Sequence, residues 1–240
     1  MKLTKSSWLL NKPVAHRGLW GNGITENSIS AYENAVKNGY PIEIDLFLTT
    51  DNVLVSFHDD NLLRMTGVNK LIYEQNLSYL KTLSISKDGE KIPTFEEVLR
   101  VVNGKVPLLI EIKNQPNKMV VDVLVERLKS YKGEFAIQSF NPLYINRVKK
   151  LAPQFTRGIL ANSIEEDLKT LSFIKRIIVK HMPLNFLIKP HFIAHSYQGL
   201  PVKKRKRKGL PVISWTVTSK EIYNEISPYV DNIIFEHFIP

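Results

Sequence analysis

Short apolar runs alternate with amphipathic stretches along the whole chain. Each apolar run is about four to eight residues long and is bounded by turn-forming residues, which is typical of buried strands. The candidate strands lie at residues 13–16, 41–47, 107–112, 134–138, 156–160, 192–195, 210–217 and 231–235. Apolar positions recur at helical spacing at residues 27–38, 94–102, 117–131, 142–151, 164–180, 201–208 and 220–226.

This alternation predicts an α/β protein with the (β/α)8 architecture of a TIM barrel, formed as a single domain over residues 1–240. A doubly wound open sheet is the alternative. It is disfavoured because no glycine-rich phosphate-binding loop follows the first strand.

The segment at residues 61–92 interrupts the alternation. It is too long for a simple connection between a strand and a helix, and it carries several leucines and isoleucines of its own. Long ordered insertions of this kind usually serve as lids or binding loops. We therefore expect a small insertion after the second strand, near the catalytic rim of the barrel. Thr94 and Glu97 form a capping-box pattern that restarts the regular alternation.

Two carboxylates lie on the otherwise apolar strand at 41–47. Alternate residues of a strand face the same side, so Glu43 and Asp45 face away from the neighbouring apolar side chains. Buried carboxylates this close need a cation or a shared proton. Glu111 and Lys113 repeat the same spacing at the end of the strand at 107–112.

Two histidines also fall where strands end. His16, with Arg17, closes the first strand, and His58 ends the extended run that follows the second. The carboxyl ends of the strands of a (β/α)8 barrel form the rim that carries the active site, so we expect all these polar residues to meet there. A buried ion-pair network is the alternative interpretation of the acidic residues.

The combination favours phosphoryl chemistry. Three converging carboxylates repel one another, and a hard divalent cation such as Mg²⁺ or Ca²⁺ relieves the repulsion through oxygen ligands. Together with Arg17 and Lys113, the cation would stabilise a pentavalent phosphoryl transition state. The histidines, with ordinary pKa values near 6.5, are suited to proton transfer near neutral pH. The sequence does not assign the acid and the base between them.

The amino-acid composition restricts the classes of binding partner and the cellular compartment that we expect. The chain has no cysteine, which excludes disulfides and thiolate metal sites. The net charge of +10 favours anionic partners. The block Lys203 to Lys208 lacks interleaved aromatic residues, so we expect a solvated helix face, with anionic membrane contact as the minor alternative and no nucleic-acid partner. The apolar run near the start spans only Trp8 to Leu10, which predicts a cytoplasmic protein without a signal or membrane span.

Eight motifs resemble those of the glycerophosphodiester phosphodiesterases. They are VAHRG at 14–18, ENS at 26–28, IEIDLFLTTDN at 42–52, VSFHDDNLLRMTG at 55–67, IPTFEEVL at 92–99, LIEIK at 109–113, QSFNP at 138–142 and SWTVT at 214–218. The resemblance implies a (β/α)8 barrel with a small insertion after the second strand. It also implies hydrolysis of glycerophosphodiesters to sn-glycerol 3-phosphate and an alcohol.

The resemblance assigns roles by position. It matches His16 and His58 to the acid and base, Glu43, Asp45 and Glu111 to the metal ligands, Arg17 and Lys113 to the phosphate contacts, and Glu26 and Trp215 to the surroundings of the pocket. A lysophospholipase D, a phospholipase C-like enzyme or a silent phosphate-binding barrel are the alternatives. Lipid substrates remain an alternative because the leucine-rich insertion at 61–92 could provide an apolar surface for an acyl chain.

Three positions depart from the family pattern. Thr25 replaces the usual proline, and we expect it to help cap the following helix. Asp51-Asn52 stands where the family has an Asp-Gly turn. We expect the turn to be kept, because asparagine tolerates positive φ. The last strand ends in Phe235-Glu236 rather than Thr-Asp, which changes what this strand offers to the pocket.

Overall fold

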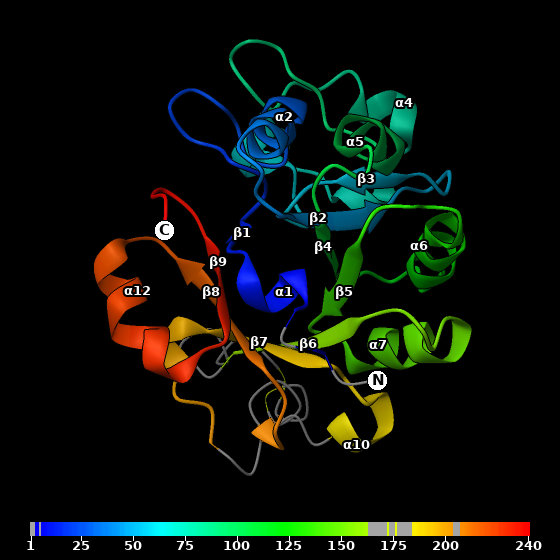
Figure 1. Cartoon of the computed structure of the whole chain (residues 1–240). Coiled ribbons are helices and arrows are strands. Elements are labelled where there is room, and N and C mark those ends of the chain that lie inside the picture. Colours follow the sequence, from blue (N-terminus) through cyan, green and yellow to red (C-terminus); the bar gives the residue numbers. More distant parts are fainter. Residues whose placement is uncertain (1–2, 5, 163–171, 173–175, 177–183, 204–206) are drawn as a thin grey trace. The chain divides into compact units, whose positions relative to one another are not determined.

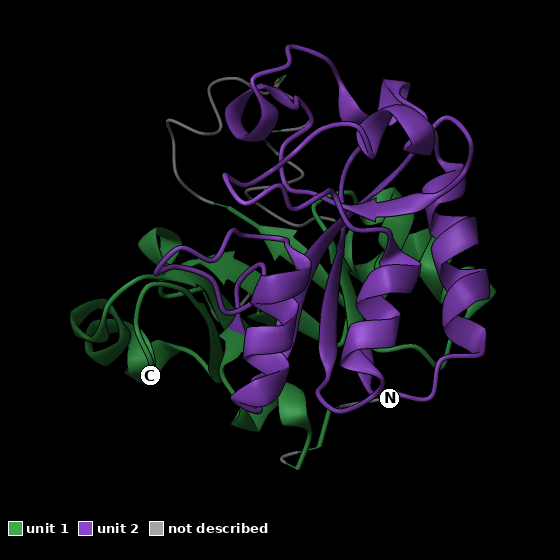
Figure 2. Cartoon of the chain, turned by 90° about the horizontal axis from the view of Figure 1, so that it is seen from above, with its two compact units in different colours: residues 1–14, 136–240 green, residues 15–135 purple. Residues whose placement is uncertain are grey.

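The computed structural model describes residues 3–4, 6–162, 172, 176, 184–203 and 207–240. The chain divides into two compact units, which Figure 2 distinguishes by colour. Unit 1 comprises residues 1–14 and 136–240, and unit 2 comprises residues 15–135. The helix expected at 164–180 lies outside the described residues except for two isolated positions, and so does the middle of the helix expected at 201–208.

Unit 2 is built around the buried strand β2 (Ile42–Leu48). It pairs in parallel with β4 (Leu108–Ile112) and, through Ala15, with β1 (Val14–Ala15). The short strand β3 (Leu54–Ser56) turns back to pair antiparallel with β2. At the turn between them Asn52 has φ of +60°, as the sequence predicts.

Three helices of unit 2 follow the predicted positions: α2 (Ile29–Lys37), α5 (Phe95–Val102) and α6 (Met119–Lys129). Helices α2 and α5 lie side by side (Figure 1). The capping box is confirmed, because the Thr94 hydroxyl accepts from the backbone N–H of Glu97 and the Glu97 carboxylate accepts from that of Thr94. The expected cap at Thr25 is wrong: the Ser28 side chain caps α2, and the Thr25 carbonyl accepts from the Ser28 hydroxyl at 2.7 Å.

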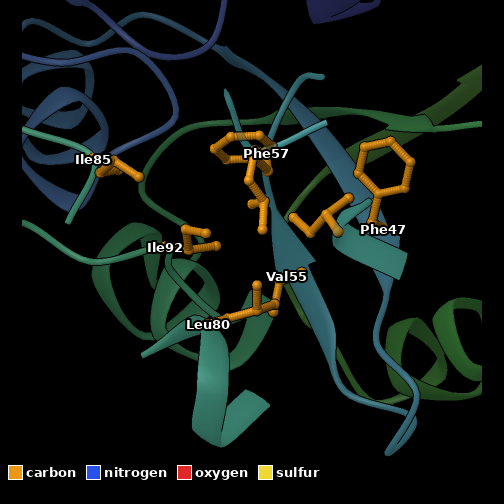
Figure 3. Close-up of a cluster of buried hydrophobic side chains, with 8 residues drawn as sticks. Phe47, Val55, Phe57, Leu80, Ile85 and Ile92 are labelled. Carbon is orange, nitrogen blue, oxygen red and sulfur yellow. The ribbon is translucent and has the colours of Figure 1, made fainter. Parts of the chain in front are cut away.

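The insertion is ordered around a hydrophobic cluster that it shares with β2 and β3. It contains α3 (Leu63–Thr66), the 3₁₀ turn η1 (Ile72–Glu74) and α4 (Leu77–Leu80). Figure 3 shows the cluster, whose buried members are Phe47, Val55, Phe57, Leu62, Ile72, Leu80, Ile85 and Ile92. Packing against the strands fixes the insertion to the sheet.

Unit 1 carries five strands that pair in parallel in chain order. They are β5 (Phe135–Ser139), β6 (Arg157–Ala161), β7 (Phe192–Ser196), β8 (Val212–Val217) and β9 (Asn232–Phe235). The accompanying elements are α1 (Trp8–Asn11), α7 (Pro142–Leu151), α10 (Asn185–Ile188), η2 (Tyr197–Gly199), α12 (Lys220–Ile226) and η3 (Ser227–Tyr229). Asn232 ties α1 to β9 by donating from its amide to the Leu9 carbonyl at 2.9 Å.

All eight predicted strands are present within two residues of their expected bounds, and β3 is additional. Among the described residues, no helix is both long and apolar enough to cross a membrane.

Candidate active site

Three buried carboxylates meet where β2 and β4 run side by side. The register places Asp45 level with Glu111, and Glu43 stands two residues before Asp45 on the same face. One oxygen of each carboxylate lies within 4.8 Å of those of the other two. Within the described residues this is the cluster whose geometry suits a metal ion.

Two cations stand against the carboxylates. Lys113 Nζ lies 3.2 Å from Asp45 Oδ1 and 3.1 Å from Glu111 Oε1. The backbone N–H of Arg17 donates to Glu43 Oε2 at 3.1 Å, and Arg17 Nε lies 3.8 Å from Asp45 Oδ2. Two positive side chains face three carboxylates, so the cluster retains an acidic excess.

The pKa values of the carboxylates separate accordingly. Burial, with repulsion from Asp45 and Glu111, raises the pKa of Glu43 well above its ordinary value. Burial also raises the pKa of Glu111 to about 7, although Lys113 opposes the shift. Burial acts in the same direction on Asp45, but attraction to Lys113 and other neighbouring cations outweighs it and lowers that pKa. Glu43 and Glu111 therefore favour their protonated forms until another cation is present.

Burial and the nearby carboxylates shift the pKa of the Lys113 amine in opposite directions. Burial alone lowers its pKa, but attraction to Asp45 and Glu111 outweighs burial and raises it. Lys113 consequently stays positively charged inside the cluster.

The loop between β1 and α2 delivers Arg17 to the cluster in an unusual backbone conformation. Arg17 has φ of +57° and Gly18 has φ of +86°. A Cβ atom on Gly18 would lie 2.7 Å from the Ala31 Cβ on α2, so the loop packs too closely against the helix to accept a side chain there. Asn27 closes the loop by donating its backbone N–H to the Arg17 carbonyl at 2.9 Å.

Asn27 also orients the central carboxylate. Its side-chain amide donates to Asp45 Oδ2 at 3.0 Å, and its amide oxygen accepts from Tyr32 at 2.8 Å and from Ser56 at 3.1 Å. All four side chains are buried. These supporting roles were not predicted from the sequence, although Asn27 lies in the ENS motif at 26–28.

His16 and His58 both follow strands that border β2. Ala15 is level with Ile42, and His16 is the next residue along the chain after β1. His58 follows β3 and is half-buried, and its Nδ1 lies 2.6 Å from Asp59 Oδ1. Burial lowers the pKa of His58, while attraction to Asp45 acts against this shift. The Asp59 contact fixes the imidazole through Nδ1.

Glu26, predicted to stand near the pocket, accepts hydrogen bonds from two arginines. Its Oε1 lies 2.9 Å from Arg17 Nη1 and 2.5 Å from Arg64 Nη2. Arg64 belongs to the insertion and was not singled out in the sequence, and neither was Asp59, which Arg64 also binds.

Trp215 and the basic block fall outside unit 2. Trp215 lies on β8 and packs edge-on against Phe140, with ring centroids 5.6 Å apart, so its place near the pocket stays a prediction. In the basic block, Lys203 and Lys208 are exposed and Arg207 pairs with Asp231 at 2.5 Å, while residues 204–206 lie outside the described part. Phe235, the first residue of the altered strand end, is buried in β9.

Residues 16–237 match the glycerophosphoryl diester phosphodiesterase family. A glycerophosphodiester phosphodiesterase of Caldanaerobacter subterraneus subsp. tengcongensis is 31% identical over 236 residues, covering 92% of each chain. A human lysophospholipase D is 34% identical over 144 residues, which cover 54% of this chain and 45% of that protein.

The solved structures agree. A phosphodiesterase of Oleispira antarctica, in complex with its product sn-glycerol-3-phosphate, superposes with a TM-score of 0.78 at 24% identity, covering 94% of this chain and 92% of that chain. The likeness confirms the predicted (β/α)8 barrel, with β3 as an extra strand, rather than a doubly wound sheet. Because the family match spans nearly the whole sequence, the chain is a phosphodiesterase that belongs to the glycerophosphoryl diester phosphodiesterase family.

Proposed function

We propose that this enzyme hydrolyses glycerophosphodiesters to sn-glycerol 3-phosphate and an alcohol, and that it requires a divalent cation. The observation that carries the proposal is the convergence of three buried carboxylates and two cationic side chains within unit 2, with His58 close enough to interact electrostatically with Asp45. Carboxylates and cations so arranged match the charge pattern of a phosphodiester bound beside a metal ion. The family membership makes the phosphodiester the natural substrate class.

The carboxylate cluster fits a hard cation. Glu43, Asp45 and Glu111 would hold Mg²⁺ or Ca²⁺, since both prefer oxygen ligands and their charge would offset the burial and the mutual repulsion that raise two of the three pKa values. When bound, such a cation neutralises negative charge and polarises a phosphoryl oxygen.

Arg17 and Lys113 bind the phosphate in this proposal. Both side chains are largely, but not fully, shielded from solvent beside the carboxylates, and the pKa of Lys113 is raised, so its charge persists across the neutral range. Their charges stabilise the negative charge that accumulates on the phosphoryl oxygens in the transition state. Glu26 orients the Arg17 guanidinium through the contact at 2.9 Å.

His16 and His58 transfer the protons. One histidine accepts the proton of the hydroxyl group that attacks the phosphorus. The other donates a proton to the oxygen of the alcohol that leaves. When the Asp59 carboxylate accepts from Nδ1 of His58, Nε2 is left to exchange a proton with the substrate. Asp59 thus selects the tautomer that can act.

A lysophospholipase D activity is the second candidate. Leu63 of α3 is 52% exposed on the insertion, and an exposed apolar residue at a binding loop suits an acyl chain. The partial likeness to a human lysophospholipase D points in the same direction.

A coupled assay separates these activities. Release of sn-glycerol 3-phosphate is measured from glycerophosphocholine and glycerophosphoethanolamine, and release of choline from lysophosphatidylcholine, after stripping metal and restoring Mg²⁺ or Ca²⁺. We expect turnover of the glycerophosphodiesters only with restored metal. Faster choline release from the lysolipid would favour the second candidate, and undiminished turnover after stripping would refute the metal requirement. Glu43→Gln is expected to lose the metal-dependent turnover, and Glu126→Gln, which changes an exposed carboxylate on α6, is its control.

We also propose a cytoplasmic location and peripheral contact with anionic membranes through the basic block. The cysteine-free sequence suits a reducing compartment, and Lys203 and Lys208 are exposed. Cell fractionation tests the compartment. Sedimentation with phosphatidylserine vesicles tests the contact, which is refuted if neutral vesicles retain equal amounts of protein.

A further inference from the structure

Arg64 joins two separate parts of the candidate site. Its guanidinium binds Asp59 through two nitrogens, with Nε 2.6 Å from Oδ2 and Nη2 3.2 Å from Oδ1. The same Nη2 lies 2.5 Å from Glu26 Oε1. Asp59 in turn contacts His58, and Glu26 contacts Arg17. One side chain of the insertion therefore completes a continuous chain of polar contacts between the histidine and the arginine of the site.

The insertion holds Arg64 at this point. Leu62, just before α3, is fully buried in the cluster of Figure 3, and its backbone N–H donates to the Lys70 carbonyl at 2.9 Å. Gly67 ends α3 with φ of +76°, which reverses the chain after a single turn. The position of Arg64 is thus set by packing on one side and by a turn on the other.

The Arg64 guanidinium lies between the carboxylates of Asp59 and Glu26. Burial raises the pKa of Asp59, but hydrogen bonds from Arg64 and His58 outweigh it and hold the pKa below its ordinary value. The hydrogen bonds to Asp59, only partly opposed by burial, together with those to Glu26, raise the pKa of Arg64. Only arginine presents donors in a planar fork that reaches both oxygens of Asp59 and a second acceptor, so lysine is a poor substitute.

We propose that Arg64 is a positioning residue that orients His58 through Asp59 and Arg17 through Glu26. The inference rests on the proposed function for its kinetic consequence. The Arg64 side chain is 47% exposed, and half-exposed ion pairs contribute little to stability. Its loss is therefore expected to affect the reaction rate rather than folding. The insertion then contributes to the geometry of catalysis as well as to substrate choice.

Kinetics of Arg64→Ala on glycerophosphocholine test the inference. We expect kcat to fall about 10- to 100-fold, the scale on which small displacements of reacting groups act, while KM changes less than about threefold. Arg64→Lys is expected to retain an intermediate rate, and added guanidinium to restore part of the rate of Arg64→Ala. The control is Arg127→Ala, which removes a comparable fork to Glu96 between α6 and α5 and is expected to stay within about twofold of the parent rate.

A double-mutant cycle shows whether Arg64 acts through Asp59. If it does, Arg64→Ala with Asp59→Asn is no slower than the slower single variant, because the two residues act as a unit. Additive losses would overturn the proposal, and so would a KM effect that carries most of the loss, since Arg64 would then contact the substrate itself. Equal rates for Arg64→Ala and Arg127→Ala would also overturn it.

Nitrogen NMR of His58 provides a readout that is independent of the substrate. We expect one tautomer, protonated at Nδ1, in the parent enzyme and a mixture of tautomers in Arg64→Ala. An unchanged tautomer overturns the positioning role even if the enzyme hydrolyses glycerophosphodiesters. A shift to mixed tautomers supports the role even if the natural substrate proves to be another phosphodiester.

Discussion

Asp45 of β2 and Glu111 of β4 lie level in the sheet, and Lys113 Nζ contacts both carboxylates. Their pKa values nevertheless move in opposite directions, down for Asp45 and up to about 7 for Glu111. Burial acts in the same direction on both pKa values, so the difference comes from the cations and the Asn27 hydrogen bond at Asp45 and from the repulsion that Asp45 exerts on Glu111. Glu111, like Glu43, therefore holds a proton that an incoming metal ion must displace.

Metal affinity is expected to rise with pH. Carboxylate ligands bind as anions, and Glu111 is protonated below about pH 7, so binding of Mg²⁺ or Ca²⁺ is weaker at pH 6 than at pH 8. The expected change approaches tenfold per pH unit for each proton released. Isothermal titration calorimetry in two buffers of different ionisation enthalpy measures the protons released. Glu111→Gln should release fewer protons, and a pH-independent affinity in the parent enzyme would contradict the prediction.

The two histidines are expected to be kinetically indispensable. His16→Ala and His58→Ala should each lower kcat at least about 100-fold, the scale of general acid–base catalysis. His237→Asn is the control, because His237 is half-exposed after β9 and asparagine tolerates its φ of +65°. A near-parental kcat in either alanine variant would remove that histidine from the mechanism.

Gly18→Ala is expected to disturb the loop between β1 and α2, which positions Arg17. The new methyl group would lie 2.7 Å from the Ala31 Cβ, and φ of +86° is strained for alanine. Overpacking and strain together should destabilise the protein by about 2 kcal/mol or more, with loss of activity as Arg17 shifts. Gly39→Ala separates the two causes, since φ there is also positive, +71°, but nothing lies within 4 Å. Urea unfolding should show the larger loss for Gly18→Ala, and equal losses would rule out the close contact as the cause.

The sequence was sufficient for the features that depend on local pattern. All residues of β2 are buried because both of its faces are covered, so the run at 41–47 is apolar apart from Glu43 and Asp45, and this pattern marks it as a buried strand. The spacing of Glu43 and Asp45 fixed their common face, and register alone then brought Glu111 beside them. The start of α5 could be predicted from Thr94 and Glu97 because a capping box depends only on residues close in sequence.

Features that depend on short elements or on tertiary contacts could not be predicted from the sequence. Helices α1 and α10 have four residues each, too few to show a helical period. Arg64 reaches Glu26 only because the insertion packs on β2 and β3, and no spacing rule links residues this far apart in sequence. Ser28 rather than Thr25 caps α2 because the helix begins only at Ile29, after the loop that Asn27 closes through the Arg17 carbonyl.

A buried histidine of unit 1 is expected to make stability depend on pH. His191 Nδ1 accepts a hydrogen bond from the backbone N–H of Arg157 at 3.2 Å, which only the neutral imidazole can do. Burial, with repulsion from the Arg157 side chain, lowers the pKa of His191 to about 4. The unfolded chain, with an ordinary histidine pKa near 6.5, therefore binds the proton first as pH falls. The stabilising contribution is complete above about pH 6.5 and is lost progressively toward about pH 4.

Replacing His191 by asparagine isolates this effect. An asparagine oxygen can accept from the Arg157 N–H but does not titrate, so we expect His191→Asn to remove that part of the acid sensitivity. Urea unfolding at pH 7.5 and pH 5, with saturating metal to keep the active-site carboxylates ionised, measures the difference. The parent enzyme should lose more stability than His191→Asn between these values. Equal losses would mean that His191 is already protonated in the folded protein at pH 5, and the hydrogen bond from Arg157 would then need another acceptor.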